Sequence, residues 1–205
     1  MYRSDRRGAQ ARRTRLRILD AAAHAFLERG YAGATMRAIA AEACVAVPTV
    51  ELGFGTKARL LKATIDVAIA GDDEPVPVLD RAWADTARTA GTSAEFLAVA
   101  AEVIVAAQSR SAGLVLAVFE GARTDPELAT LATQLAEQRA ATARWLVEAL
   151  ARFAPPHGDA VDDLWLLMDP AIYERLVRNR GWTPRHYERW FARSAHALLY
   201  PGRTR

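Results

Sequence analysis

The sequence of 205 residues contains one cysteine, Cys44, and no long hydrophobic run. A single cysteine cannot form an internal disulfide, so the chain fits a reducing compartment. The most apolar region, residues 96–119, is interrupted by Glu102 and by the polar stretch 108–111, which leaves fewer than the roughly 18 apolar residues of a membrane span. The apolar stretch after the basic start carries charges at helical spacing, which argues against an export signal. These absences predict a cytoplasmic protein without a membrane segment.

Motifs of catalytic and metal sites are lacking as well. The four histidines show neither HExxH nor CxxC spacing, and no phosphate loop, dinucleotide fingerprint or nucleophile elbow occurs. His157 with Asp159, Asp162 and Asp163 has the composition of a loop metal site. Acids at a helix start, however, normally act as caps and dipole partners. We therefore expect no enzyme, no cofactor and no metal; an enzyme that uses a pocket in the later part of the chain is kept as an alternative.

The net charge of +3 is unevenly distributed along the chain. Residues 1–17 hold seven arginines and one acid. Up to Lys62 there are twelve basic and five acidic residues, which gives +7 and leaves −4 for residues 63–205. A basic first third of this kind indicates a polyanion partner, either nucleic acid or an anionic membrane.

Alternating β-branched patterns with hairpin turns are absent, and alanine is frequent, so the fold class is predicted to be all-α. Gly30 ends the first helix, and Thr35, Thr56, Asp125, Asp169 and Thr183 are expected to be helix N-caps. Residues 71–77, rich in Asp and Pro, are expected to form a linker or loop. We expect helices over residues 15–29, 36–43, 47–52, 57–70, 78–90, 94–108, 112–123, 126–153, 161–168, 170–180 and 184–199.

Two short helices joined by a tight break, residues 35–54, have the length and apolar spacing of a helix-turn-helix. In that motif the first helix packs across the second and holds it in the major groove of DNA. The segment RLRILDAAAHAFLERGYAGATMRAIAAEACVAVPTVELGFGTKARLLKA, residues 15–63, resembles the DNA-binding domain of the TetR (tetracycline repressor) family of transcriptional regulators. The matching residues, in order, are Ile18, Leu19, Ala22, Phe26, Gly30, Tyr31, Thr35, Ile39, Ala40, Ala43, Val45, Thr49, Phe54, Lys57, Leu60 and Leu61.

The resemblance implies a cytoplasmic homodimer, a repressor that binds palindromic operator DNA and is released by a small-molecule effector. It divides the chain into a disordered basic arm over residues 1–11, a DNA-binding domain of three helices over 12–72 that contains the helix-turn-helix 35–54, and a larger helical effector-binding and dimerisation domain over 73–205. A helical ligand-binding dimer whose DNA-binding domain has decayed is the alternative. The basic residues flank a helix-turn-helix without a lipid-facing stripe, which favours DNA over a membrane.

Residue types at the matching positions suggest how DNA is bound. Thr35 and Lys57, at helix starts, suit phosphates. Val47, Pro48 and Thr49, at the front of the second short helix, are placed for base edges. The backbone or the minor groove is the expected target of Arg37 and of the basic residues Arg12, Arg13 and Arg15. In the structural alternative Thr35 is only a cap, Lys57 is only solvated and the arginines form a solubilising tail.

Three residues depart from the family pattern. The family has Gly where Cys44 stands, so Cys44 is expected to hold a left-handed conformation that Gly adopts freely. It has Ser where Ala46 stands, and the lost hydroxyl cap costs about 1 kcal/mol of helix stability. It has a phosphate-facing Tyr where Glu51 stands, so Glu51 is expected to repel DNA unless an arginine neutralises it. Cys44 as a redox switch is the alternative to a small turn residue.

The later part of the chain carries two groups of apolar side chains. Five aromatic residues lie on apolar helix faces and are expected to surround an effector pocket. The alternative is that they only fill the core. They are Trp83, Phe96, Phe119, Trp145 and Trp165. The last two predicted helices present a wide apolar face, which indicates a two-fold dimer interface. Its residues are Tyr173, Leu176, Val177, Tyr187, Trp190, Phe191, Ser194 and Leu198.

Overall fold

The computed structural model describes residues 2–201, and the side chains of residues 8–201. Residues 2–201 contain helices and no strand, which confirms the all-α prediction. The chain divides into two compact units, Met1–Asp73 with Gly113–Ala132, and Glu74–Ala112 with Thr133–Arg205. The sequence-based division placed all of residues 73–205 in the second domain, whereas residues 113–132 belong to the first unit of the structure.

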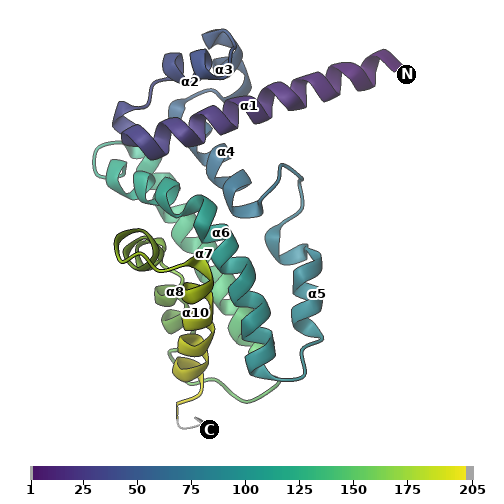
Figure 1. Ribbon diagram of the computed structural model, residues 1–205, viewed down its shortest axis with the longest axis vertical. Coiled ribbons are helices and arrows are strands. Elements are labelled where there is room, and N and C mark those ends of the chain that lie inside the picture. Colours follow the sequence, from purple (N-terminus) through teal and green to yellow (C-terminus); the bar gives the residue numbers. More distant parts are fainter. Residues whose placement is uncertain (1, 202–205) are drawn as a thin grey trace. The chain divides into compact units, whose positions relative to one another are not determined.

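The first unit contains α1 (Tyr2–Gly33), α2 (Met36–Glu42), α3 (Val47–Phe54) and α4 (Lys57–Ala70). Helix α1 packs against α2 and α4, and α3 packs against both α2 and α4 (Figure 1). Phe26, Ile39, Val50 and Leu61 are at most 1% exposed and form the centre of this bundle. The core is small, and each of the four helices contributes to it.

The start of α1 differs from the sequence expectation. Residues 2–11 were expected to be a disordered arm, but α1 begins at Tyr2, and only residue 1 of the arm lies outside the described residues. The segment has no proline, and six of its ten residues are Arg, Ala or Gln, which are good helix formers, so the helix continues toward the amino terminus. At the other end Gly30 has φ 63°, which interrupts the helix where the sequence predicted its end.

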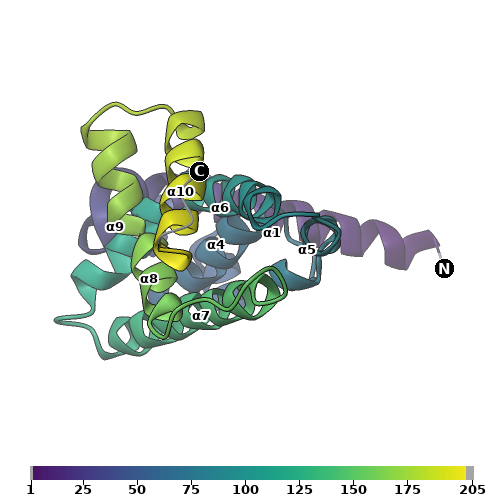
Figure 2. The same cartoon turned by 90° about the horizontal axis from the view of Figure 1, so that it is seen from below.

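The second unit contains η1 (Val78–Asp80), α5 (Ala82–Arg88), α8 (Ala160–Leu167), α9 (Pro170–Tyr173), the π-helical turn η2 (Glu174–Asn179) and α10 (Pro184–Leu199). Most of α6 (Ser93–Gly121) and α7 (Pro126–Leu150) also belongs to it. In both Figure 1 and Figure 2, α10 lies beside α6 and α8. The helix predicted over 170–180 is therefore divided between α9 and a π turn, whereas Asp169 and Thr183 are N-caps as predicted.

Two helices predicted over 94–108 and 112–123 form the single helix α6. The polar stretch between them lies inside the helix, where Ser109 and Ser111 donate hydrogen bonds to the carbonyls of Ala106 and Ala107, each at 2.8 Å. Helix α6 is the one described helix long and apolar enough to cross a membrane by composition. Of its most apolar 18 residues 44% are buried inside the chain, and core helices of water-soluble proteins pass the same test.

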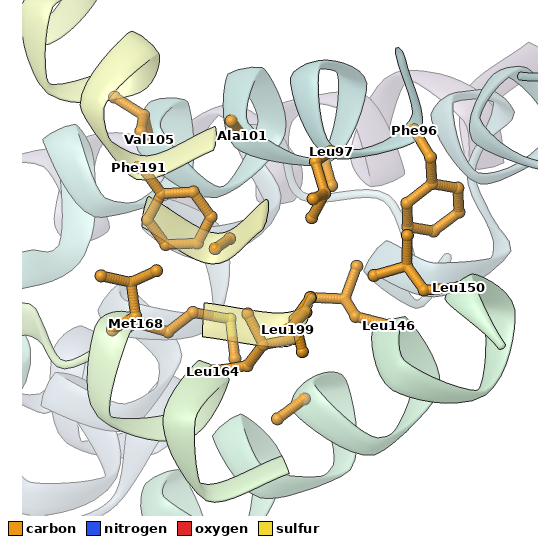
Figure 3. Packing of buried hydrophobic residues seen from close by; sticks show 14 of the residues in the cluster. Phe96, Leu97, Ala101, Val105, Leu146, Leu150, Leu164, Met168, Phe191 and Leu199 are labelled. Carbon is orange, nitrogen blue, oxygen red and sulfur yellow. The ribbon is translucent and has the colours of Figure 1, made fainter. Parts of the chain in front are cut away.

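The core of the second unit is a set of apolar side chains contributed by α5, α6, α7, α8, α9 and α10, part of which Figure 3 shows. The residues labelled there are Phe96, Leu97, Ala101 and Val105 of α6, Leu146 and Leu150 of α7, Leu164 of α8 with Met168 after it, and Phe191 and Leu199 of α10. Each helix turns a single stripe inward, as the three-four spacing of the sequence predicts.

Candidate nucleic-acid interface

The helix-turn-helix is built as the sequence predicts. Thr35 is the N-cap of α2, and its Oγ1 accepts a hydrogen bond from the Ala38 amide at 3.1 Å. The chain turns after Glu42, where the Val45 amide bonds to the Ala40 carbonyl at 2.9 Å. Helix α3 then begins at Val47 with proline in its first turn, and it extends to Phe54, two residues beyond its predicted end.

Both backbone expectations at the turn are confirmed. Cys44 has φ 52° and is the one non-glycine residue among the described ones with positive φ. Ala46 holds the N-cap position of α3 without a side-chain hydrogen bond. The turn that joins the two helices is therefore strained at Cys44 and uncapped at Ala46, although the helices keep their expected positions.

Helix α3 presents a broad exposed surface. Val50 is fully buried against the bundle, whereas Pro48, Thr49 and Glu51 are exposed. Leu52 is 93% exposed, more than any other large apolar residue described, and the sequence-based candidates did not include it. The exposure of Leu52 could have been predicted from helical spacing, because a residue two positions from the buried Val50 points to the opposite face of the helix. Val47, at the edge of this surface, is half-buried.

The candidate arginines of α1 have different surroundings. Arg12 pairs with Asp73, whose Oδ2 lies 2.7 Å from Arg12 Nε, and this hydrogen bond lowers the pKa of Asp73. Arg13 donates to Gln10 at 2.7 Å. The Arg15 guanidinium lies 4.7 Å from the centre of the Phe54 ring, at the end of α3. Arg15 is thereby the one of these three arginines whose side chain contacts α3.

Lys57, at the start of α4, makes internal contacts. Its Nζ donates to the carbonyls of Tyr31 and Ala34 at 2.7 and 3.1 Å and lies 4.1 Å from the centre of the Tyr31 ring. Burial lowers the pKa of Lys57, an effect that the nearby Asp125 opposes. The bonds to the carbonyls at the end of α1 and just after it give Lys57 a structural role that the sequence did not reveal. Arg37 is exposed on α2.

Residues 18–64 match the sequence model of bacterial regulatory proteins of the tetR family. The matched segment covers the bundle from the first buried residues of α1 to the middle of α4, including the whole helix-turn-helix. The amino-terminal domain is a TetR-family domain. No curated protein sequence matches the chain.

Solved structures of regulators share the fold over nearly the whole chain. The regulator FadR from Bacillus subtilis, solved in complex with stearoyl-CoA, is 16% identical, with a TM-score of 0.69 over 90% of this chain and 99% of its own. The fatty acid degradation regulator FadR from Bacillus halodurans is 17% identical, with a TM-score of 0.65 over 93% and 97%. The TetR-family regulator PfmR from Thermus thermophilus is 19% identical, with a TM-score of 0.59 over 92% and 96%. The chain thus has the fold of these transcriptional regulators.

The five aromatic candidates for an effector pocket lie in three places. Trp83, Phe96 and Trp145 form one cluster, in which the Trp145 ring lies 5.4 Å from Trp83 and 6.0 Å from Phe96. Trp165 packs under Arg139, with 4.3 Å from the guanidinium to the ring centre. Phe119 belongs to the first unit. The structure therefore gathers three of the five residues.

A groove of about 380 Å³ lies along α7 and α8, with Trp165 at its wall. Charged side chains, Glu137, Arg144 and Asp162, also line it, together with Ala136. This groove has a mixed polar and apolar surface.

Three buried polar atoms of the described side chains lack a hydrogen-bond partner: Gln108 Oε1, Arg139 Nε and the Tyr187 hydroxyl. Two of these atoms belong to Gln108 and Arg139, whose side chains bind the two residues between α8 and α9. Gln108 Nε2 donates to the Met168 carbonyl at 2.9 Å, and Arg139 pairs with Asp169 at 3.0 Å. Sequence analysis did not single out either residue, because polar residues inside apolar helices carry no periodic signal.

The expected dimer face is narrower than the sequence indicated. Tyr173, Tyr187 and Phe191 are at most 2% exposed and belong to the core of their own chain, so they do not lie on a surface. Helical spacing alone does not tell a core-facing stripe from a partner-facing one. The other members, partly or fully accessible, are Leu176, Val177, Trp190, Ser194 and Leu198.

Proposed function

We propose that this protein is a cytoplasmic transcriptional repressor that binds palindromic operator DNA as a homodimer and leaves it when a small apolar molecule binds. The observation that carries the proposal is the exposed surface of α3 in a helix-turn-helix whose opposite face is buried. One such helix contacts few base pairs, so a two-fold dimer that reads two half-sites is the usual way to reach specificity. The net charge of +7 up to Lys62 supports DNA as the partner.

The first test measures binding of the protein to DNA upstream of its own gene over a range of salt concentrations. Each phosphate contact contributes a slope of about −0.9 to log K against log salt, so several contacts per dimer give a steep line. A footprint with two-fold symmetry is also expected. A flat salt response without a footprint would contradict the proposal and favour a ligand-binding dimer with a decayed DNA-binding domain.

Single substitutions separate phosphate contacts from base contacts. Arg37→Ala is expected to weaken binding to all sequences alike and to reduce the salt slope by about two, since each dimer loses one contact per subunit. Thr49→Ala is expected to change base preference. Arg185→Ala, an exposed cation of α10, is the matched control and leaves both unchanged. Normal binding by the first two variants would contradict this mode of docking.

Lys57→Ala requires a second measurement. The expected result is weaker binding to all sequences, but the same substitution removes the hydrogen bonds to the Tyr31 and Ala34 carbonyls. Its unfolding free energy is therefore measured alongside the affinity. A loss of affinity under conditions in which the variant stays folded supports a phosphate contact, and unchanged affinity would contradict one.

The dimer is supported by Trp190, Ser194 and Leu198, which recur every four residues along α10 and thus share one side of it. Leu198 is 41% exposed within one chain. A self-complementary patch of this kind suits a two-fold interface. In light scattering coupled to size exclusion, Leu198→Glu is expected to give monomer. Leu27→Glu, at a leucine of α1 that is 53% exposed, is the control and is expected to stay dimeric.

Release by an effector is supported by the apolar helical unit and by the likeness to Bacillus subtilis FadR, which binds stearoyl-CoA. Any effector that weakens operator binding must itself bind more weakly in the presence of DNA, by the same factor. Mass spectrometry of ligand carried through purification tests this, followed by titration of that ligand into the DNA complex. A ligand recovered chemically altered would favour an enzyme instead.

A further inference from the structure

The exposed surface of α3 has a defined order of side chains. Successive residues of an α-helix are 100° apart, so two residues turn it by 200°. Because Val50 points into the bundle, Pro48 and Leu52 point almost directly away from it. Thr49 and Glu51 lie on the two sides of this pair. The centre of the surface is therefore apolar, with a hydroxyl on one side and a carboxylate on the other.

The chemistry of this surface limits what it can read. Helix α3, VPTVELGF, contains no Arg, Lys, Asn or Gln, the residues that make two-pronged hydrogen bonds to guanine or adenine. Leu52 is 93% exposed at the centre of the surface. In the major groove the one apolar group on a base edge is the thymine C5 methyl. A carboxylate accepts best from the N4 amino group of cytosine, because the other amino group there, N6 of adenine, lies beside the acceptor N7.

We propose that Leu52 and Glu51 are specificity-determining residues that read pyrimidines in the operator, Leu52 through a thymine methyl and Glu51 through a cytosine N4 amino group. This inference rests on the proposed function, since it requires that α3 enters the major groove. It gives Glu51 a role other than that of the phosphate-facing tyrosine of the family. Glu51 forms no ion pair with any residue of the range 8–201, so its carboxylate is available.

The Leu52 contact is tested on an operator half-site selected from random DNA by the full-length protein. Replacing thymines of the site one at a time with deoxyuridine removes single methyl groups, and one of them is expected to weaken binding about fourfold. The affinity of Leu52→Ala is expected to be unchanged by that same replacement. Leu27→Ala, the control on α1, is expected to lose affinity as the unsubstituted protein does. Full sensitivity to deoxyuridine in Leu52→Ala, or none in the unsubstituted protein, would overturn the Leu52 assignment.

The Glu51 contact is tested with Glu51→Gln. Glutamine pairs with adenine, so the variant is expected to change its preference at one position from cytosine to adenine by about 5- to 100-fold. The new contact uses adenine N7 and is lost with 7-deazaadenine. Asp20→Asn, an exposed carboxylate of α1, is the control and leaves the selected site unchanged. A uniform gain of affinity for all sequences in Glu51→Gln would mean that Glu51 only repels phosphate and would overturn the Glu51 assignment.

The two levels of the proposal fail differently. If a discrete site is selected but neither α3 variant changes the bases preferred, the reading of pyrimidines is wrong and the repressor proposal stands. If no site is selected and binding shows no salt dependence, the proposed function itself is contradicted. Selection is performed on the protein as purified. Arg37→Ala, in α2, is the reference variant, because it is expected to weaken binding without changing the bases that are selected.

Discussion

The hydroxyl of Tyr31 donates a hydrogen bond to the Asp125 carboxylate at 3.0 Å. Asp125 also caps α7, because its other oxygen accepts from the Glu127 and Leu128 amides at 2.9 and 3.3 Å. Burial, followed by this hydrogen bond, raises the pKa of Tyr31. One carboxylate thus joins the residue that follows the Gly30 break of α1 to the start of α7, and it does so within the first unit.

Tyr31→Phe is expected to lower the free energy of unfolding by about 1 to 2 kcal/mol, since a hydrogen bond to a charged acceptor is lost while the ring beside Lys57 is kept. Urea denaturation followed by circular dichroism measures the change. Asp125→Asn is the companion variant, because asparagine has a single acceptor oxygen and cannot accept from both the α7 amides and the phenol. It is expected to lose at least as much stability as Tyr31→Phe, and equal stability of Tyr31→Phe and the unsubstituted protein would contradict a stabilising bond between Tyr31 and Asp125.

Cys44 holds φ 52° on an exposed turn, which a side chain with Cβ adopts at a cost. Cys44→Gly is expected to raise the free energy of unfolding by about 1 kcal/mol, since glycine adopts this conformation without a Cβ clash. Cys44→Ala is the matched control, because it removes the thiol and keeps the strain. A gain in both variants would assign the cost to the thiol rather than to the backbone.

Much of the first unit could be predicted from the sequence because its signals are local. Each of these features depends on a residue type at or near its own position in the sequence. Examples are the caps at Thr35 and Thr56, the positive φ of Cys44 and the bounds of α4. The same holds for Leu52, whose exposure follows from its spacing to Val50. It was missed because base contacts were sought among the first residues of α3.

The contacts that depend on distant residues could not be predicted. The hydrogen bonds of Lys57 to carbonyls of residues 31 and 34, and the pairing of Arg12 with Asp73, join positions that no spacing rule connects. Apolar stripes on the last helices were equally ambiguous, since Tyr187 and Phe191 face the core of their own chain and Leu198 faces outward. A sequence shows that a face is apolar, whereas only the fold shows what covers it.

His24 joins α1 to α2 through its ring, whose Nδ1 lies 2.7 Å from Glu42, while Nε2 lies 3.2 Å from Glu28. The Glu42 hydrogen bond, followed by the charges of Glu28 and Glu42, raises the pKa of His24. A raised pKa in the folded state means that folding favours the protonated ring. This contribution is complete below the ordinary pKa of about 6.5 and is lost as the pH rises through the folded value.

The melting temperature of the unsubstituted protein is therefore expected to fall as the pH rises above about 6.5, and His24→Gln is expected to remove this part of the pH dependence. His186→Gln, at an exposed histidine of α10, is the control and is expected to retain the pH dependence. Both variants are compared with the unsubstituted protein in a series of buffers of equal ionic strength, because exposed ion pairs are screened by salt. The same slope in His24→Gln as in the unsubstituted protein would assign the pH dependence to other groups.

Tyr187 and Tyr200 form a natural comparison for the cost of a buried hydroxyl. Both are at most 6% exposed, but the Tyr187 hydroxyl has no partner among the described residues, whereas Tyr200 donates to the Leu150 carbonyl at 3.1 Å. Burial raises the pKa of Tyr187, so the group stays neutral at physiological pH. An unpaired buried polar group costs about 1 to 3 kcal/mol relative to an apolar one.

Tyr187→Phe is accordingly expected to leave the free energy of unfolding unchanged or to raise it, whereas Tyr200→Phe lowers it by about 1 kcal/mol. The two substitutions remove the same atom from the same kind of core, so the difference between them isolates the hydrogen bond. Chemical denaturation in the absence of added ligand measures both. A loss of stability in Tyr187→Phe equal to that in Tyr200→Phe would show that a molecule held in the core, such as an ordered water, bonds the Tyr187 hydroxyl.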